Sequence, residues 1–482
     1  MSRSFRKYWK DSQTMTSQKG KGHEMSIVER LAGMDLIWLQ VEQDTNPAHL
    51  TALLVTATPV RPADLAARLA ERLGAFERFG QQVLQDVVGA VWEAGHFDPR
   101  AQLSVECLPP GEARGALANL AGRLAATRLP LTAPLWHCHL VEHYEQGSAL
   151  ILRVHQCIGD SIALVSLLRS LLDDEPAPAV SRKLPAAPRQ ENFYARLYAP
   201  LTHAMVEGIK ISGAFWASYW GLLFNPRQVF DYACANTALA LEIGKLGGLE
   251  DDGETPLKGR PGGTKQAGWT PPIPHPRIEA IALRHDSSPD AIMLTALGGA
   301  LRHFLEQRGP VSRQLEIRCL MPANLRNESS DEQLGNRCGL IPFELPVGIE
   351  APILRLHETH KRIRRFEQAY EAQRALGLFN LIGQTPRGVQ LQSLKLLATK
   401  SSALLLQIPG TGAPRQLCGA GICEEMYWSP PPGDLGVSIS VVHSDGHCQL
   451  GILADAAMIP QPAILAGMIE AELEALGQLG PA

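Results

Sequence analysis

Hydrophobic and polar residues alternate with two different periods over the first third of the chain. Residues 51–58 are rich in Val, Leu and Thr, which predicts a strand, and residues 62–76 repeat apolar positions every three or four residues, which predicts a helix. Residues 134–144 and 149–155 predict two strands joined by a tight turn, and residues 161–172 predict a helix with leucines on one face. This order of elements is typical of an α/β domain.

The middle of the chain breaks this pattern. Residues 176–189 hold four prolines and no apolar period, which is the composition of a linker. Residues 194–242 return to helical spacing, and six aromatic residues gather between positions 198 and 224. We interpret this segment as a helix packed on a domain or, alternatively, as a surface that dips into lipid. A loop rich in glycine and proline spans residues 247–276.

A second α/β pattern follows this loop. Its predicted elements are helix 291–308, strand 314–321, helix 353–372, strands 436–443 and 448–454, and helix 463–479. The sequence therefore predicts two α/β domains joined by a long helical linker. The predicted boundaries are 1–25 for a disordered basic tail, 26–175 for the first domain, 176–270 for the linker and 271–482 for the second domain.

Composition and charge narrow the classes of function. The 482 residues are 45% hydrophobic and 20% charged, and the net charge of −4 argues against a protein devoted to nucleic acid. The nine cysteines form no CxxC pair, so we expect free thiols in a reducing compartment and no metal site. No apolar run of about 18 residues occurs, so no membrane-spanning helix is predicted. The basic, polar start lacks the apolar core of a secretory signal, and Met25 is an alternative start.

The segment with the most specific chemistry spans residues 155–161, with the sequence HQCIGDS, at a predicted strand-to-helix junction. Asp160 directly precedes an apolar helical run, where a carboxylate commonly caps the helix N-terminus. His155 is a candidate general base, because a neutral imidazole accepts a proton near neutral pH. Neighbouring strand residues point to opposite faces, so His155 and Gln156 are predicted to face apart. A buried, hydrogen-bonded structural role for His155 is the alternative.

Three histidines are predicted to share one face of the strand at residues 134–144. They are His137, His139 and His143. Alternate positions on a strand share a face, so these side chains either pack or line a substrate site. Metal binding is the alternative.

The segment HQCIGDS and six further segments in the same order resemble the wax ester synthase/diacylglycerol acyltransferase family, whose motif is HHxxxDG. The further segments are residues 31–54, 134–139, 258–269, 288–291, 321–326 and 407–410. His155 and Asp160 match the motif. Gln156 replaces its second histidine, and Ser161 replaces its closing glycine. The resemblance covers about residues 26–480.

The resemblance implies two chloramphenicol-acetyltransferase-like domains, each a mixed sheet flanked by helices, with a substrate channel between them. It implies transfer of a fatty acyl group from acyl-CoA to diacylglycerol or a long-chain alcohol, with acyl-CoA as a substrate and no cofactor. It also implies a cytoplasmic protein in peripheral contact with the inner membrane face or with lipid inclusions. The implied catalytic residues are His155, Gln156 and Asp160, and the implied substrate-binding residues are His139, Asp290, Asn324 and Arg326.

The resemblance implies that the second histidine of the motif acts as the general base. Gln156 stands at that position and cannot perform this role. An amide oxygen accepts hydrogen bonds but takes no proton near neutral pH. Loss of a general base typically lowers the rate by about 10²–10⁴, whereas the positioning of two bound substrates survives. Three hypotheses follow: slow acyl transfer, a catalytically impaired relative that binds acyl-CoA or lipid without turnover, and transfer to another acceptor in which substrate or water handles the proton.

Overall fold

The computed structural model describes most of both α/β halves. The described residues are 29–31, 33–85, 90–109, 111–173, 252–324, 334–336, 338–376, 398–410, 414–444 and 446–480. The predicted basic tail, the proline-rich segment at 176–189, the aromatic segment at 198–224 and Arg326 lie outside these residues. Within the described ranges, no helix is both long enough and apolar enough to cross a membrane.

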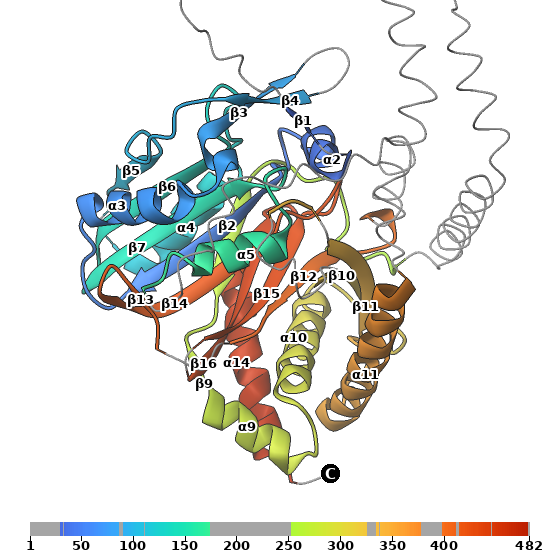
Figure 1. Cartoon of the computed structure of the whole chain (residues 1–482). Coiled ribbons are helices and arrows are strands. Elements are labelled where there is room, and N and C mark those ends of the chain that lie inside the picture. Colours follow the sequence, from blue (N-terminus) through green and yellow to red (C-terminus); the bar gives the residue numbers. More distant parts are fainter. Residues whose placement is uncertain are drawn as a thin grey trace, which may run out of the picture.

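The N-terminal half is built on a six-stranded mixed sheet (Figure 1). In order across the sheet, the strands are β13 (Gln416–Leu417), β14 (Ala420–Trp428), β2 (His49–Thr56), β7 (Gly147–His155), β6 (Trp136–Tyr144) and β5 (Leu103–Glu106). β5 pairs in parallel with β6, whereas the other neighbours pair antiparallel. The three central strands β2, β7 and β6 confirm the strands predicted from the sequence.

Two strands of this sheet come from the C-terminal part of the chain. β14 lies antiparallel to β2, with Tyr427 opposite Ala52 and Trp428 opposite Thr51. In Figure 1 this orange strand lies among the blue and teal strands. The domain boundaries predicted from the sequence include residues 416–428 in the second domain. Their backbone pairing places them in the sheet of the N-terminal half. Strand pairing between segments so far apart leaves no local pattern in the sequence.

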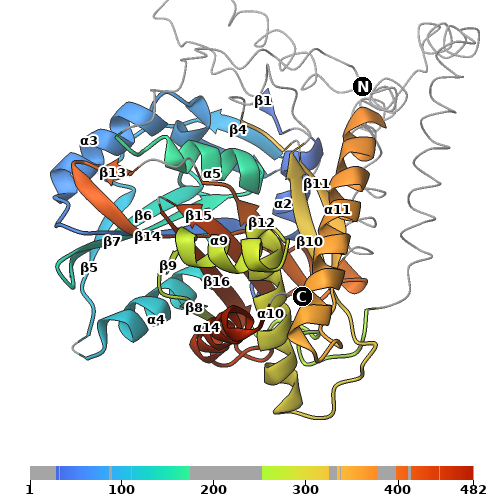
Figure 2. The ribbon, with the colours of Figure 1, turned by 90° about the horizontal axis from the view of Figure 1, so that it is seen from below.

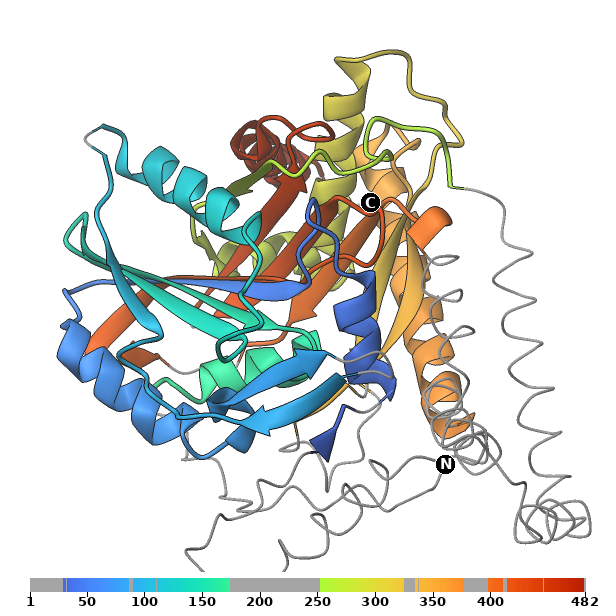
Figure 3. The same cartoon turned by 90° about the horizontal axis from the view of Figure 1, so that it is seen from above.

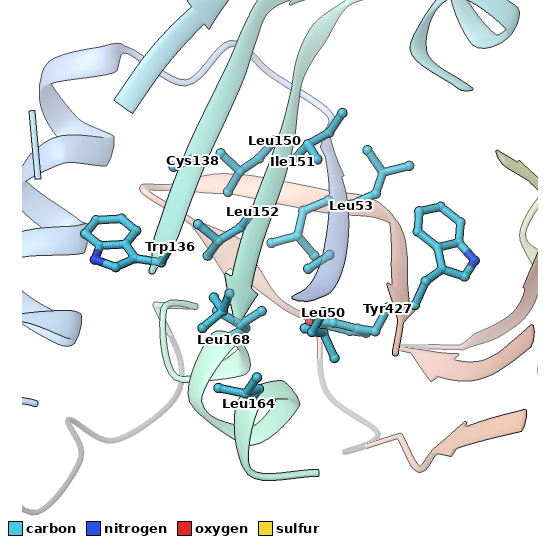
Figure 4. Close-up of a cluster of buried hydrophobic side chains, with 14 of the residues drawn as sticks. Leu50, Leu53, Trp136, Cys138, Leu150, Ile151, Leu152, Leu164, Leu168 and Tyr427 are labelled. Carbon is cyan, nitrogen blue, oxygen red and sulfur yellow. The ribbon is translucent and has the colours of Figure 1, made fainter. Parts of the chain in front are cut away.

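Helices cover both faces of the N-terminal sheet. α3 (Pro62–Leu73) and α5 (Ser161–Arg169) lie on one side, and α4 (Ala113–Ala125) lies on the other (Figure 3). Leu164 and Leu168 of α5 share a buried cluster with Leu152 and Trp136 of the sheet, each at most 2% exposed (Figure 4). Burial of one such side chain stabilises the fold by roughly 1.5–3 kcal/mol. Packing therefore fixes the orientation of α5 on the sheet.

The C-terminal half contains a second mixed sheet, of seven strands. Its order is β11 (Cys338–Leu345), β10 (Ile317–Asn324), β12 (Ala403–Ile408), β15 (Val437–Ser444), β16 (His447–Asp455) and β8 (Lys265–Trp269), and β9 (Ile273–Pro274) also pairs with β16. β10, β12 and β15 run parallel to one another. The edge strand β8 falls inside the predicted linker (176–270), so the second half begins earlier in the chain than its sequence pattern indicated.

The two faces of the second sheet have different neighbours. One face packs in its own core with α9 (His275–Arg284), α10 (Pro289–Glu306), α11 (Pro352–Leu376) and α14 (Pro462–Gln478) (Figure 2). The other face contributes Leu406, Ile408 and Val442 to the core of the N-terminal half. A small third sheet, β1 (Glu29–Arg30), β4 (Ala90–Ala94) and β3 (Gln81–Gln85), lies near the start of the described chain, with α2 (Gly33–Val41) after β1. The predicted architecture of two α/β halves, each a mixed sheet flanked by helices, is confirmed.

The first residue of β7, Gly147, follows the turn from β6 and must be glycine, because an added Cβ would lie 1.8 Å from the backbone oxygen of Thr56 at the end of β2. We predict that Gly147→Ala lowers the free energy of unfolding by roughly 1–3 kcal/mol, the usual cost of overpacking, as measured by urea denaturation. The matched control is Gly467→Ala in α14, where no atom lies within 4 Å of the added Cβ. The control should stabilise the protein by about 0.5–1 kcal/mol. Equal effects of the two substitutions would contradict this account of the turn.

Candidate active site

The segment HQCIGDS forms the junction between β7 and α5, as predicted. β7 ends at His155, and α5 begins at Ser161. Asp160 caps this helix, because its Oδ1 accepts a hydrogen bond of 3.0 Å from the backbone N–H of Ala163. Such a cap stabilises a helix by about 1 kcal/mol. The cap and the packed face of α5 together fix the loop that carries Gln156.

The side chain of Gln156 belongs to a buried cluster of neutral groups. Its Nε2 donates to the hydroxyl oxygens of Ser161 at 2.7 Å and of Ser429 at 3.2 Å. The two hydroxyls also contact each other. The exposed fractions of Gln156, Ser161 and Ser429 are 1%, 3% and 2%. Among the described residues, no donor reaches Oε1 of Gln156, and a buried acceptor left unsatisfied typically costs about 1–3 kcal/mol.

Ser429 is a member of this cluster that the sequence analysis did not identify. It directly follows β14, the strand that crosses from the C-terminal half. The buried carboxylate of Glu425 anchors that strand, since it accepts hydrogen bonds from Arg169 Nε at 2.8 Å, the Tyr427 hydroxyl at 2.7 Å and the Ser444 hydroxyl at 2.9 Å. Arg169 is the last residue of α5, so this network joins the motif helix to the crossing strand.

His155 has different neighbours from Gln156. Its Nδ1 accepts a hydrogen bond of 3.0 Å from the backbone N–H of Cys157, and its Nε2 lies 3.6 Å from Oε1 of Glu42. Burial raises the pKa of Glu42, but the hydrogen bond and charge of His155 and the hydrogen bonds from Arg128 and the Ala48 backbone lower that pKa overall, to about 2. With Nδ1 as acceptor, a neutral ring carries its proton on Nε2, facing this carboxylate. The ring then has no free lone pair with which to take a proton from a substrate.

A second contact from the C-terminal half holds the backbone of the motif. Nδ2 of Asn336, just before β11, donates to the carbonyl oxygen of Gln156 at 2.8 Å and to Oδ1 of Asp35 at 2.8 Å. The carbonyl oxygen of Gly335 accepts a hydrogen bond of 3.5 Å from the N–H of Asp160. Burial is the main cause that raises the pKa of Asp35 to about 6, against the opposing effect of its hydrogen bonds to Asn336. Both halves of the chain therefore close around the motif.

Two predicted substrate-binding residues lie on the C-terminal sheet and its helices. Asp290, in the first turn of α10, places its Oδ1 3.0 Å from Nε2 of His443 on β15. Asn324 is the last residue of β10 and lies opposite Cys338 of β11. None of the contacts described for Asp290 involves the motif, whereas His155, Gln156 and Asp160 lie together at the junction of β7 and α5.

His139 lies in a row of polar side chains on β6 and its neighbours. Its ring bonds to Glu106 at 2.8 Å and to Arg153 at 3.1 Å, and burial is the main cause that lowers its pKa. The ring of His137 contacts the Ser104 hydroxyl at 2.8 Å, and burial lowers its pKa to about 4. In the part of the chain that the structure describes, no group of three or more His, Cys, Asp or Glu side chains is arranged to hold a metal ion. These histidines have protein partners instead.

Comparison with known families identifies the class of protein. Residues 31–216 match the wax ester synthase/diacylglycerol acyltransferase catalytic domain, and residues 334–477 match the WS/DGAT C-terminal domain. The chain belongs to the wax ester synthase/diacylglycerol acyltransferase family. The first match includes the whole of HQCIGDS, and membership of this acyltransferase family confirms the resemblance predicted from the sequence.

The proteins and solved structures described next match nearly the whole length of this chain. "Probable diacyglycerol O-acyltransferase tgs1" of Mycobacterium tuberculosis (strain ATCC 25618 / H37Rv) is 23% identical over 461 residues, which cover 92% of this chain and 94% of that protein. The solved wax ester synthase/diacylglycerol acyltransferase from Marinobacter aquaeolei VT8 covers 94% of this chain and 100% of its own, with a TM-score of 0.64 and 16% identity. The first condensation domain of the calcium-dependent antibiotic synthetase covers 95% of this chain and 98% of its own, with a TM-score of 0.57 and 14% identity. These two structural likenesses show a shared fold.

Because the pKa of Asp35 is raised in the folded state, ionisation of Asp35 lowers the free energy of unfolding. The folded state holds the proton up to about pH 6, whereas the unfolded chain releases it near 3.8, so this group lowers stability as pH rises between those values. We predict that Asp35→Asn, which keeps an acceptor for Asn336, adds roughly 2–3 kcal/mol more to the free energy of unfolding at pH 8 than at pH 4. Urea denaturation at both pH values measures the difference. An equal effect at the two pH values would rule out a buried carboxylate of this kind.

Proposed function

We propose that this protein transfers a fatty acyl group from acyl-CoA to diacylglycerol or a long-chain alcohol. The observation that supports this most is the family match in both halves, combined with a motif junction to which both halves contribute. Asn336 and Ser429, from the C-terminal half, contact the backbone and the side chain of Gln156. A transfer between two substrates depends on holding both in one place, and a site at the meeting point of two halves suits that requirement.

In the proposed reaction, the hydroxyl oxygen of the acceptor forms an ester bond with the thioester carbonyl carbon while the bond from that carbon to sulfur breaks. The proton of the hydroxyl ends on the released thiol of CoA. Gln156 takes no proton, so the proton passes to the leaving sulfur directly or through water. The contribution of Gln156 is to orient the hydroxyl through its amide oxygen. Without a general base the rate is lower by about 10²–10⁴ than with one.

We assign positioning roles to the two motif residues that match the family. Asp160 holds the start of α5 through its cap on Ala163. His155 holds the end of β7 between the backbone of Cys157 and the carboxylate of Glu42. Asn324 and Arg326, at and beyond the end of β10, remain our proposed supports for the substrates. His139 and Asp290 have protein partners, which favours structural roles for both.

A second candidate function is binding of acyl-CoA or lipid without turnover. One observation favours it: the groups hydrogen-bonded around the Gln156 side chain, two serine hydroxyls and the amide itself, include none that titrates near neutral pH. In either function we propose peripheral contact with the cytoplasmic membrane face or with lipid inclusions, because acceptors with long chains reside there. The aromatic segment at 198–224 is the proposed contact surface.

The two functions predict different results for the parent protein, and Gln156→His is measured beside it. We expect the purified protein, with palmitoyl-CoA and hexadecan-1-ol or dioleoylglycerol, to form ester slowly, and we expect Gln156→His to raise the rate by about 10²–10⁴ by restoring an imidazole base. Thiol release and ester formation are measured together. His155→Ala should leave the rate of the folded protein within a few-fold, because His155 takes no proton in this mechanism.

Each alternative outcome has a defined meaning. Ester formed by Gln156→His but not by the parent would support binding without turnover. Ester formed by the parent and lost in a folded His155→Ala variant would mean that His155 is a displaced base, contrary to the role assigned here. No ester from any variant, with either acceptor, would contradict acyl transfer to alcohols.

A further inference from the structure

A serine, a histidine and a glutamine form a hydrogen-bonded chain near the edge of the N-terminal sheet. The hydroxyl of Ser104 on β5 lies 2.8 Å from Nε2 of His137 on β6. Nδ1 of the same ring lies 3.2 Å from Oε1 of Gln102, the residue just before β5. A nucleophile within hydrogen-bond reach of a base, with the base oriented by a third group, is the geometry that activates a hydroxyl for attack on a carbonyl.

The partner of each ring nitrogen fixes the direction of these hydrogen bonds. Oε1 of Gln102 is an acceptor, so His137 carries its proton on Nδ1 and donates it to this oxygen. Nε2 then holds a lone pair and accepts the hydrogen of the Ser104 hydroxyl. Burial, followed by the charges of His139 and Arg153, lowers the pKa of His137 to about 4. The ring is therefore neutral near neutral pH and can take the hydroxyl proton.

Backbone pairing and burial hold the three side chains in this arrangement. Gln102 is 8% exposed, and its carbonyl oxygen accepts a hydrogen bond of 2.9 Å from the N–H of Cys138. The parallel pairing continues with Ser104 opposite His139, so Gln102 and Ser104 lie on one face of the sheet, on either side of the His137 ring. The base is thus fixed between its orienting group and its nucleophile.

This face of the sheet is open to solvent near β5, which is the last strand in the order of the sheet. Ser104 and His137 are both partly exposed, and the side chain of Glu106, on the same face of β5 as Ser104, is 30% exposed. Alternate residues of a strand direct their N–H groups to opposite sides. Gln102 faces β6, so the N–H of Val105 points away from β6. The N–H after the nucleophile is a donor that α/β-hydrolases use to stabilise the oxyanion.

We propose that Ser104 is the nucleophile of a hydrolytic site, with His137 as its general base and Gln102 as the positioning residue for that base. The substrate class is a carboxylic ester or thioester, whose carbonyl carbon accepts attack by an activated hydroxyl. Arg153, opposite His137 on β7, supplies positive charge that favours the anionic intermediate. The site goes beyond the proposed acyl transfer and uses neither Gln156 nor the rest of the HQCIGDS motif.

The proposed reaction has two steps. In the first, Oγ of Ser104 forms a bond with the carbonyl carbon, Nε2 of His137 takes the hydroxyl proton, and the bond from that carbon to the leaving oxygen or sulfur breaks. The proton passes from His137 to the leaving group, which departs as an alcohol or a thiol. In the second step, water attacks the acyl-serine by the same route, which releases the carboxylic acid and restores the serine.

Labelling of the full chain with an alkyl fluorophosphonate tests the nucleophile. Oγ of a reactive serine displaces fluoride from this probe, and mass spectrometry of the digested protein locates the adduct. We expect the adduct on Ser104 and its loss in Ser104→Ala. His137→Asn, which keeps a polar side chain but offers no base, should lower the labelling rate by about 10² or more. The matched control is Ser170→Ala, which removes a partly exposed hydroxyl bonded to the carbonyl of Leu167 and should keep the parent's rate.

Hydrolysis of 4-nitrophenyl butyrate tests turnover and the role of Gln102. Ser104→Ala should reduce the release of 4-nitrophenol to the rate in buffer. Gln102→Leu, which frees the His137 ring from its orienting acceptor, should lower the rate by about tenfold. Gln102→Glu restores an acceptor and adds a charge that stabilises the imidazolium, so it should keep at least the parent's rate. Thermal unfolding of each variant shows whether it is folded.

The outcomes separate this site from the proposed acyl transfer. The absence of an adduct on Ser104 in the parent would overturn the hydrolytic site, and so would equal labelling of the parent and a folded His137→Asn variant. Equal hydrolysis by folded Gln102→Leu and Gln102→Glu variants would contradict the positioning role of Gln102. An adduct on Ser104 without ester formation from acyl-CoA would support the hydrolytic site while contradicting acyl transfer. Ester formation without an adduct on Ser104 would support acyl transfer and overturn the hydrolytic site.

Discussion

The strand β14 leaves the C-terminal half and pairs antiparallel with β2, and this backbone pairing holds the candidate site together. It places Ser429 against the side chain of Gln156, which follows β7 on the other side of β2. The buried carboxylate of Glu425 fixes the strand, because Arg169 of α5 and Arg415 both donate to it, at 2.8 and 3.1 Å. Removing one partner from a buried ion pair typically costs about 3–5 kcal/mol, since the other charge is left uncompensated. The crossing strand and the motif helix are thus held in one geometry.

The strand pairing and the network around Glu425 fix which groups surround Gln156, and these groups determine the chemistry that the site can perform. The cap at Asp160 and the contact of Asn336 with the Gln156 carbonyl preserve the backbone of the motif loop. The side chain hydrogen-bonded to the serine pair is an amide and not an imidazole, so it can form hydrogen bonds but takes no proton near neutral pH. Nδ1 of His155 accepts a hydrogen bond from the Cys157 backbone, and its Nε2 lies 3.6 Å from Oε1 of Glu42. The chain keeps the architecture of its family, but the hydrogen-bonding groups around Gln156 are neutral. This combination is consistent with slow acyl transfer or with binding of acyl-CoA or lipid alone.

The sequence predicted those features that depend on neighbouring residues. The strand that ends at His155, the cap at Asp160 and the helix that follows all arise from local periodicity and capping, and all were found. Alternation along a strand predicts that His155 and Gln156 face apart, and in the structure β7 ends at His155 and the two side chains have different partners. The placement of Asp290 and His139 near substrate came from the resemblance, and the structure gives both residues protein partners.

Other parts of the site could not be predicted, because they depend on contacts between distant segments. Ser429, Asn336 and Asp35 carry no signature in their own neighbourhoods, and each reaches the motif or its partner only through the meeting of the two halves. The same limit explains why the pairing of β14 with β2 could not be predicted from the sequence. A strand's own residues show that it is extended, but its partner is chosen by pairing across the fold.

A disulfide between positions 161 and 429 tests most directly whether the crossing strand completes the site. The hydroxyls of Ser161 and Ser429 are in contact, so paired cysteines at these positions lie within reach of a disulfide. The account predicts that mild oxidation of the Ser161→Cys, Ser429→Cys double variant gives a linked pair of peptides by mass spectrometry, which neither single variant gives. A folded double variant whose two introduced cysteines stay unlinked, or pair only with native cysteines, would contradict it.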